Sequence, residues 1–258
     1  MSEHNNHQNM HYTTSIQNLE NNLKLSVFGQ DHAIKEISSR IMIREAGLGD
    51  LHKPIASFLF TGPTGVGKTE LAIELAKNLN LHFERFDMSE YSSDHSVSTL
   101  IGAASGLKGY DEGGVLTNAI KKNPHCVLLL DEIEKADKII LNTFLQILDY
   151  GVLTSSKGEK VDFSHVIIIM TSNLGATAKS TVGFGSSSSI NRNDAVNEFL
   201  SPELRARIEC KIEFNPLTKE MVQAITDKFL KQLSDKLYIQ HKMMIVTAKA
   251  REEIVNRA

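Results

Sequence analysis

Residues 62–69 constrain the fold of this chain more than any other segment. They read Gly-Pro-Thr-Gly-Val-Gly-Lys-Thr, a glycine-rich loop that ends in a lysine and a hydroxyl residue. The backbone N–H groups of such a loop surround a phosphate, and the N-terminus of the next helix adds positive potential. The motif is informative when it joins a strand to a helix. An apolar run at 57–60 precedes it and a helical pattern at 68–79 follows it. We therefore predict an α/β core with a phosphate site at this loop.

Short apolar runs alternate with helical patterns along the middle of the chain. The strand-like runs are residues 57–60, 82–86, 126–130 and 166–170, and the helical patterns are residues 68–79, 114–122 and 139–148. Strands separated by helices need crossover connections, which produce a parallel sheet covered on both faces. The sequence thus predicts an α/β fold whose parallel sheet is sandwiched by helices.

The chain divides into three parts by its composition. Residues 1–15 are rich in His, Asn and Ser and have no period, which is typical of a disordered polar tail. We expect a large domain at 16–208 and a smaller, mostly helical domain at 209–258, with helical patterns at 218–237 and 249–256. The last of these helices lacks a following partner, so we expect the small domain to be incomplete. A Gly- and Ser-rich segment within 174–193 predicts a long loop.

Charge and cysteine content exclude several classes of partner. The chain has 28 basic and 31 acidic residues, a net charge of -3, so no broad potential attracts nucleic acid or an anionic membrane. No apolar run is long enough to span a bilayer, and the two cysteines have no metal-ligand spacing. We expect a soluble cytoplasmic protein with neither a membrane nor a nucleic-acid partner.

The phosphate-binding loop predicts ATP and Mg²⁺ as cofactors. Lys68 is expected to bridge the β- and γ-phosphates, and Thr69 to coordinate Mg²⁺. The remaining loop positions assigned to the nucleotide are Gly62, Thr64, Gly65, Val66 and Gly67.

Two acidic residues follow the most apolar predicted strand. Asp131 and Glu132 come directly after residues 127–130, at the carboxyl edge where open α/β sheets bind ligands. We expect Asp131 to hold Mg²⁺ and Glu132 to polarise the attacking water. Asn173 follows the strand at 166–170 and is a candidate to contact both the γ-phosphate and the water. Taken alone, Asn173 could equally cap a turn.

With these motifs in this order, the chain resembles the AAA+ ATPases of the Clp family, most closely the second ATPase module of the ClpA type. The resemblance runs from about residue 25 to the C-terminus. The supporting segments are residues 27–30, 62–69, 87–91, 128–136 and 170–173.

The resemblance assigns further residues to the nucleotide. Val27 and Phe28 match a segment that lies against the adenine in the family. Arg207 matches the arginine finger, which reaches the γ-phosphate of a neighbouring subunit and therefore implies a ring, expected to be a homo-hexamer. Such an arginine is worth about three to five orders of magnitude in turnover in related enzymes. For Arg205, a surface salt bridge remains an equal alternative.

Two loops match family segments that bind proteins. Leu107 and Lys108 align with the pore loop that grips unfolded protein substrates, although Leu107 stands where the family carries an aromatic residue. Val182, Gly183 and Phe184 resemble the tripeptide that docks on the ClpP peptidase. The resemblance therefore implies an ATP-dependent unfoldase and translocase that feeds substrates to ClpP.

Two alternatives stay open. A disaggregase module of the ClpB type has the same ATPase parts but does not dock on ClpP. A nucleotide-binding fragment without turnover is the other alternative, because the chain ends before the Gly-Ala-Arg segment with which the family's lid contacts the phosphates.

Overall fold

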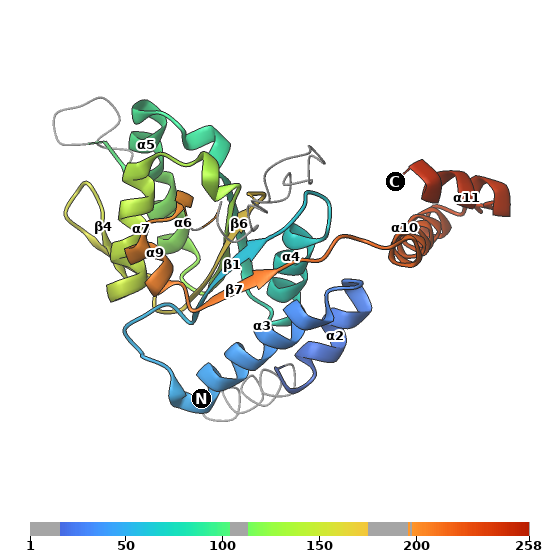
Figure 1. Ribbon diagram of the computed structural model, residues 1–258, viewed down its shortest axis with the longest axis horizontal. Coiled ribbons are helices and arrows are strands. Elements are labelled where there is room, and N and C mark those ends of the chain that lie inside the picture. Colours follow the sequence, from blue (N-terminus) through green and yellow to red (C-terminus); the bar gives the residue numbers. More distant parts are fainter. Residues whose placement is uncertain (1–15, 104–112, 175–195, 197, 258) are drawn as a thin grey trace, which may run out of the picture.

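The computed structural model describes residues 16–103, 113–174, 196 and 198–257. Within them, five parallel strands form one sheet in the order β2-β3-β6-β1-β7 (Figure 1). Their bounds are β1 Ala56–Thr61, β2 His82–Asp87, β3 Cys126–Asp131, β6 Val166–Ser172 and β7 Cys210–Glu213. The four predicted strands are thus confirmed, each longer by one or two residues.

The central strands are apolar along their whole length because both faces of the sheet are covered. Every residue of β3 and β6 is buried. In β3, Leu128 and Leu130 point into one core, whereas Val127 and Leu129 point into the other. A parallel sheet with helices on both faces requires this kind of strand, since neither face meets water.

Two groups of helices provide the covering layers, as the fold prediction required (Figure 1). The first core is closed by α2 Leu19–Ser26, α3 Asp31–Ile43 and α4 Lys68–Asn78. The second is closed by α5 Asp94–Ile101, α6 Val115–Lys122, α7 Lys138–Tyr150 and α9 Pro202–Arg207. Short helical turns η1 Arg44–Leu48, η2 Met88–Tyr91 and η4 Ile133–Lys135 complete this part, together with an antiparallel hairpin of β4 Val152–Thr154 and β5 Lys160–Asp162.

Strand β7 corrects the domain boundary expected at residue 208. It pairs in parallel with β1, from Phe58 opposite Cys210 to Thr61 opposite Glu213, so the sheet-bearing part extends at least to Glu213. The sequence pattern missed β7 because the strand is short and has only Ile212 buried. An edge strand of this kind lacks the apolar run by which the other strands were found.

Helices α10 Lys219–Ile239 and α11 Ala248–Arg257 lie to one side of the sheet (Figure 1), as the helical patterns predicted. Arg251 of α11 forms a bidentate ion pair with Asp227 of α10. In the described part of the chain, no helix is both long and apolar enough to cross a membrane. The expected pore-loop and ClpP-docking residues, like the predicted tail at 1–15, fall outside the described residues.

We expect Leu129→Ala to lower the free energy of unfolding by about 2–5 kcal/mol, because it leaves a cavity beneath a strand that cannot collapse. Leu129 is fully buried, whereas Leu25 is 76% exposed. Leu25→Ala is therefore the matched control, expected to change stability by less than about 0.5 kcal/mol. Urea unfolding of both variants checks this, and equal losses would contradict the two-sided core.

A candidate nucleotide site at the carboxyl edge of the sheet

The phosphate-binding loop leaves β1 and enters α4 at the carboxyl edge of the sheet. Its first glycine is required by close packing, because Gly62 has φ +142° and an added Cβ would lie 2.7 Å from the carbonyl oxygen of Phe214. The N–H of Phe214 donates to Thr61 at 2.7 Å, so the chain leaving β7 is held against the loop. The last glycine, Gly67, caps the N-terminus of α4 with φ +103°. The loop is therefore shaped by the neighbouring chain as well as by its own sequence.

Lys68 is oriented by three hydrogen bonds from its ammonium group. Its Nζ donates to the carbonyl oxygens of Gly62 at 2.6 Å and Pro63 at 2.8 Å, and to Oδ1 of Asn173 at 2.8 Å. Burial lowers the pKa of Lys68, and attraction to Glu134 and the other nearby carboxylates opposes that shift. The positive charge is thus held at the mouth of the loop, where a phosphate would bind.

Asp131 ends β3 with both carboxylate oxygens engaged. Arg85 of β2 places Nε 3.0 Å and Nη2 2.7 Å from Oδ2, while the hydroxyl of Thr171 donates to Oδ1. Arg85 and Thr171 come from the two strands that flank β3 in the sheet. This arrangement fixes the direction of a carboxylate that is only 8% exposed.

Glu132 sits beside Asp131 in a backbone conformation that few non-glycine residues adopt, with φ +54° and ψ +54°. Its N–H donates to the Thr171 hydroxyl at 3.0 Å, and its Oε1 accepts from Nδ2 of Asn173 at 3.1 Å. The Asn173 N–H donates to Glu134 at 2.9 Å, which fixes that amide in turn. Asn173 therefore connects Lys68 to Glu132 in a single chain of hydrogen bonds.

One cleft collects most of the residues predicted for the phosphates. Those that line it are Thr64, Gly65, Gly67, Lys68, Thr69, Asp131, Glu132 and Asn173. Arg85 and Glu70 also line it and were missed by the sequence prediction. The Thr69 hydroxyl and the Asp131 carboxylate are hard oxygen donors, and Mg²⁺ is usually held by one or two such protein groups together with phosphates and waters. The residues present thus fit the predicted metal.

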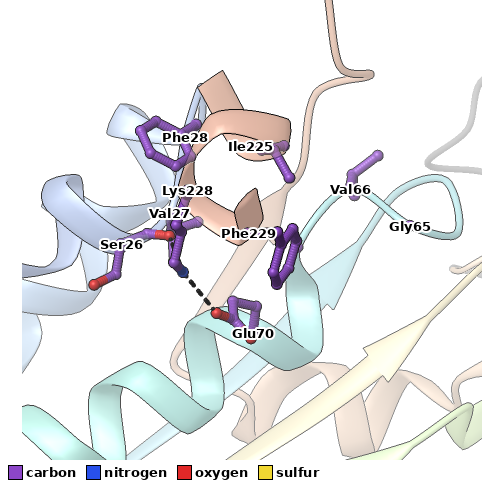
Figure 2. A pocket seen from close by; sticks show the side chains of 10 residues that line it. Ser26, Val27, Phe28, Gly65, Val66, Glu70, Ile225, Lys228 and Phe229 are labelled. Atoms are coloured by element: carbon purple, nitrogen blue, oxygen red, sulfur yellow. Dashed lines mark hydrogen bonds and ion pairs between the residues drawn. The ribbon is translucent and has the colours of Figure 1, made fainter. Parts of the chain in front are cut away.

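A second pocket adjoins the loop and contains the two predicted base contacts. Val27 and Phe28 line it together with Gly65, Val66 and Gly67. Helix α10 also contributes to this pocket, through Ile225, Lys228 and Phe229 (Figure 2). Aliphatic and aromatic walls with few polar groups suit a flat, largely apolar base. The α10 residues were missed because only the tertiary structure brings that helix to the loop.

Gln30 ties the base pocket to the phosphate loop. Its side chain donates to the carbonyl oxygens of Val66 at 3.3 Å and Asn215 at 2.9 Å, and accepts from the Asn215 N–H at 3.0 Å. It is 2% exposed. Gln30 lies in the segment 27–30 that carried the family resemblance, but only these bonds show what its side chain does.

Arg207 does not line the nucleotide cleft of its own chain. It lies at the end of α9, where its Nε is 2.5 Å from Asp149 Oδ2 of α7 and its Nη1 donates to the Glu203 carbonyl at 2.9 Å. The structure thus separates Arg207 from the other candidate catalytic residues, Glu132 and Asn173. Arg205, on the same helix, is partly buried.

With the site assembled, comparison with known proteins identifies the family. Residues 53–211, more than half of the chain, match the family model described as AAA domain (Cdc48 subfamily). The chain belongs to this family. Its sequence places it with the Clp-type AAA+ ATPase modules, as the motifs predicted.

The relatives include both Clp types considered above. A ClpA homolog protein from Fuscovulum blasticum is 47% identical over 239 residues, 92% of this chain and 30% of the relative. Chaperone protein ClpB from Clostridium tetani is 45% identical over 241 residues, 91% of this chain and 28% of the relative. A closed-state cryo-electron-microscopy reconstruction of Hsp104 with ATPγS and FITC casein has a TM-score of 0.76 at 38% identity, covering 91% of this chain and 40% of that chain. The chain thus spans about a third of these curated relatives' length.

We expect Thr171→Val to reduce ATP turnover about 10- to 100-fold with little change in KM. The valine removes the hydroxyl that joins the Asp131 carboxylate to the Glu132 N–H, and hydrogen bonds to charged groups are worth about 1.5–3 kcal/mol. Steady-state phosphate release measures both constants. Thr171→Ser keeps the hydroxyl and should stay near the parent protein, and an equal loss in both variants would count against the hydroxyl bridge.

Proposed function

We propose that this chain is an ATP-dependent unfoldase and translocase module, working in a homo-hexameric ring and coupled to the ClpP peptidase. One observation carries the proposal. Lys68, Asn173 and Glu132 form one connected set at the phosphate cleft, while Arg207 does not line it and pairs with Asp149 instead. An ATPase whose arginine lies outside its own cleft needs a neighbouring subunit to complete its site.

The connected residues divide the work of hydrolysis among them. Glu132 positions and polarises the attacking water, with its orientation set by Asn173. Lys68 would bind the γ-phosphate, and Asn173 would respond to it through the lysine, whose ammonium donates to Asn173 Oδ1. Mg²⁺, held through Thr69 and Asp131, would neutralise charge on the phosphates. The Asn173 amide would thus link the γ-phosphate to the attacking water, so that turnover requires a nucleotide that carries a γ-phosphate.

The position of Arg207, which does not line the cleft of its own chain, supports the proposed ring. We expect Arg207→Ala to lower turnover by about 10³-fold while leaving nucleotide affinity unchanged, since the residue is outside its own cleft. Phosphate release and calorimetric titration with ADP measure the two effects. Size measurement with and without a slowly hydrolysed ATP analogue shows whether a ring forms.

A mixing experiment separates an arginine supplied by a neighbour from one that acts within its own chain. Arg207→Ala retains Glu132, and Glu132→Gln retains Arg207, so each should be inactive alone. In rings of a random equal mixture, roughly a quarter of the interfaces would combine an intact Glu132 with an intact Arg207. Turnover should therefore recover on mixing. No recovery in rings shown to contain both chains would overturn the arrangement.

The choice between ClpP coupling and disaggregation depends on residues 182–184. Identities of 47% to a ClpA homolog and 45% to a ClpB favour neither type decisively. The tripeptide Val182-Gly183-Phe184 favours ClpP, because an aliphatic and an aromatic side chain within a Ser-rich sequence suit a partner's apolar pocket. Leu107 and Lys108 are proposed to contact the unfolded substrate, and casein accompanies Hsp104 in the related reconstruction.

We expect replacement of all three docking residues by serine to abolish degradation of a labelled unfolded protein by ClpP, while ATP turnover stays within twofold. The physical reason is the loss of the aliphatic and aromatic side chains that would contact an apolar pocket of the partner, while none of the residues that line the cleft is changed. The triple variant Ser186→Ala, Ser187→Ala and Ser188→Ala is the control, because it changes three neighbouring residues of the same Ser-rich sequence. Undiminished degradation would favour the ClpB-type alternative.

A direct test exists for the alternative that this chain binds nucleotide but does not hydrolyse it. Phosphate release by the parent chain is compared with that of Glu132→Gln, which removes the carboxylate but preserves the shape of the side chain. Equal release from both would leave only nucleotide binding as the function of this chain.

A further inference from the structure

Lys228 of α10 is the centre of a contact that the nucleotide mechanism does not use. Its ammonium donates to the carbonyl oxygen of Ser26 at 2.8 Å and to the carboxylate of Glu70 at 2.9 Å. Ser26 is the last residue of α2, and Glu70 lies in the first turn of α4, directly after Thr69. One side chain thus joins three helices that are distant in the sequence.

This contact lies in the wall of the base pocket. Ser26, Glu70 and Lys228 line it, and Figure 2 shows Lys228 reaching from α10 toward Glu70. The Lys228 side chain is 17% exposed. The Glu70 side chain is 39% exposed, so solvent partly screens the ion pair, and the hydrogen bond to the Ser26 carbonyl adds direction to the contact.

The Lys228 contact sets the position of α10, and with it the position of two neighbouring side chains on that helix. Ile225 and Phe229 flank Lys228 and supply apolar wall to the same pocket. Phe229 is nevertheless 57% exposed, so little packing holds that side chain in place. The two hydrogen bonds of Lys228 therefore fix the distance between α10 and the segment that carries Val27 and Phe28, which the burial of Phe229 is too small to do.

We propose that Lys228 is a positioning residue for the nucleotide base: it pins α10 across the base pocket and does not contact the phosphates. This inference rests on the proposed nucleotide site. Its consequence is a division of affinity: loss of Lys228 weakens the base contribution much more than the phosphate contribution, to which it is linked only through Glu70 at the edge of the cleft. Nucleotide binding would in turn hold α10 against the sheet-bearing part, because such coupling is reciprocal.

Calorimetric titration of the full chain tests this with two ligands, MgADP and magnesium tripolyphosphate, the second having no base. We expect Lys228→Met to weaken MgADP about tenfold and to leave tripolyphosphate affinity within twofold. Lys231→Met is the matched control, since Lys231 is an exposed lysine one turn further along α10. Lys228→Arg, which can keep both contacts, should recover most of the affinity.

The outcomes are distinguishable. Unchanged MgADP affinity in Lys228→Met would overturn the positioning role. An equal loss of affinity for both ligands would also overturn it, because Lys228 would then act through the phosphate loop. Failure of the parent chain to bind MgADP would instead overturn the proposed nucleotide site. A KM for ATP raised about tenfold with unchanged kcat would support the proposal independently, because a general loss of folded protein lowers apparent kcat and leaves KM unchanged.

Discussion

The structure depends on the burial of β3 and β6 side by side between two helical layers. Because neither strand meets water on either face, each must be apolar until it reaches the edge of the sheet. Polar side chains can then appear only where the strands end. The parallel register brings Asp131 and Thr171 to the same edge as the phosphate-binding loop that follows β1. The layered core thus decides where chemistry can occur.

At that edge, the polar groups restrain one another rather than standing free. Thr171 joins the Asp131 carboxylate to the Glu132 backbone, and Asn173 joins Glu132 to Lys68. A carboxylate that is already held by a neighbouring amide loses less freedom when a ligand binds, which is the advantage of preorganisation. The positive φ of Glu132 belongs to the same arrangement, since its N–H is directed to the threonine hydroxyl.

The base pocket follows a different principle from the phosphate cleft. The cleft is built within the sheet-bearing part, whereas the pocket is closed by α10, a helix from the other part of the chain. Burial alone holds this helix weakly, as the exposure of Phe229 indicates. Lys228 holds α10 to α2 and α4 at this pocket, and the proposed coupling between nucleotide binding and the position of α10 rests on these contacts.

The sequence by itself determined the α/β layering, the phosphate loop and the acidic pair, because each is a local pattern: apolar runs, a glycine-rich turn, two acids after a buried strand. It missed β7, whose alternating charged residues at the sheet edge give no apolar run. Only the tertiary structure decided that Arg85 and Thr171 hold Asp131, that Gln30 ties Val66 to Asn215, and that α10 closes the base pocket. These contacts join residues far apart in the chain, and their partners depend on strand order and helix docking, which local periodicity does not encode.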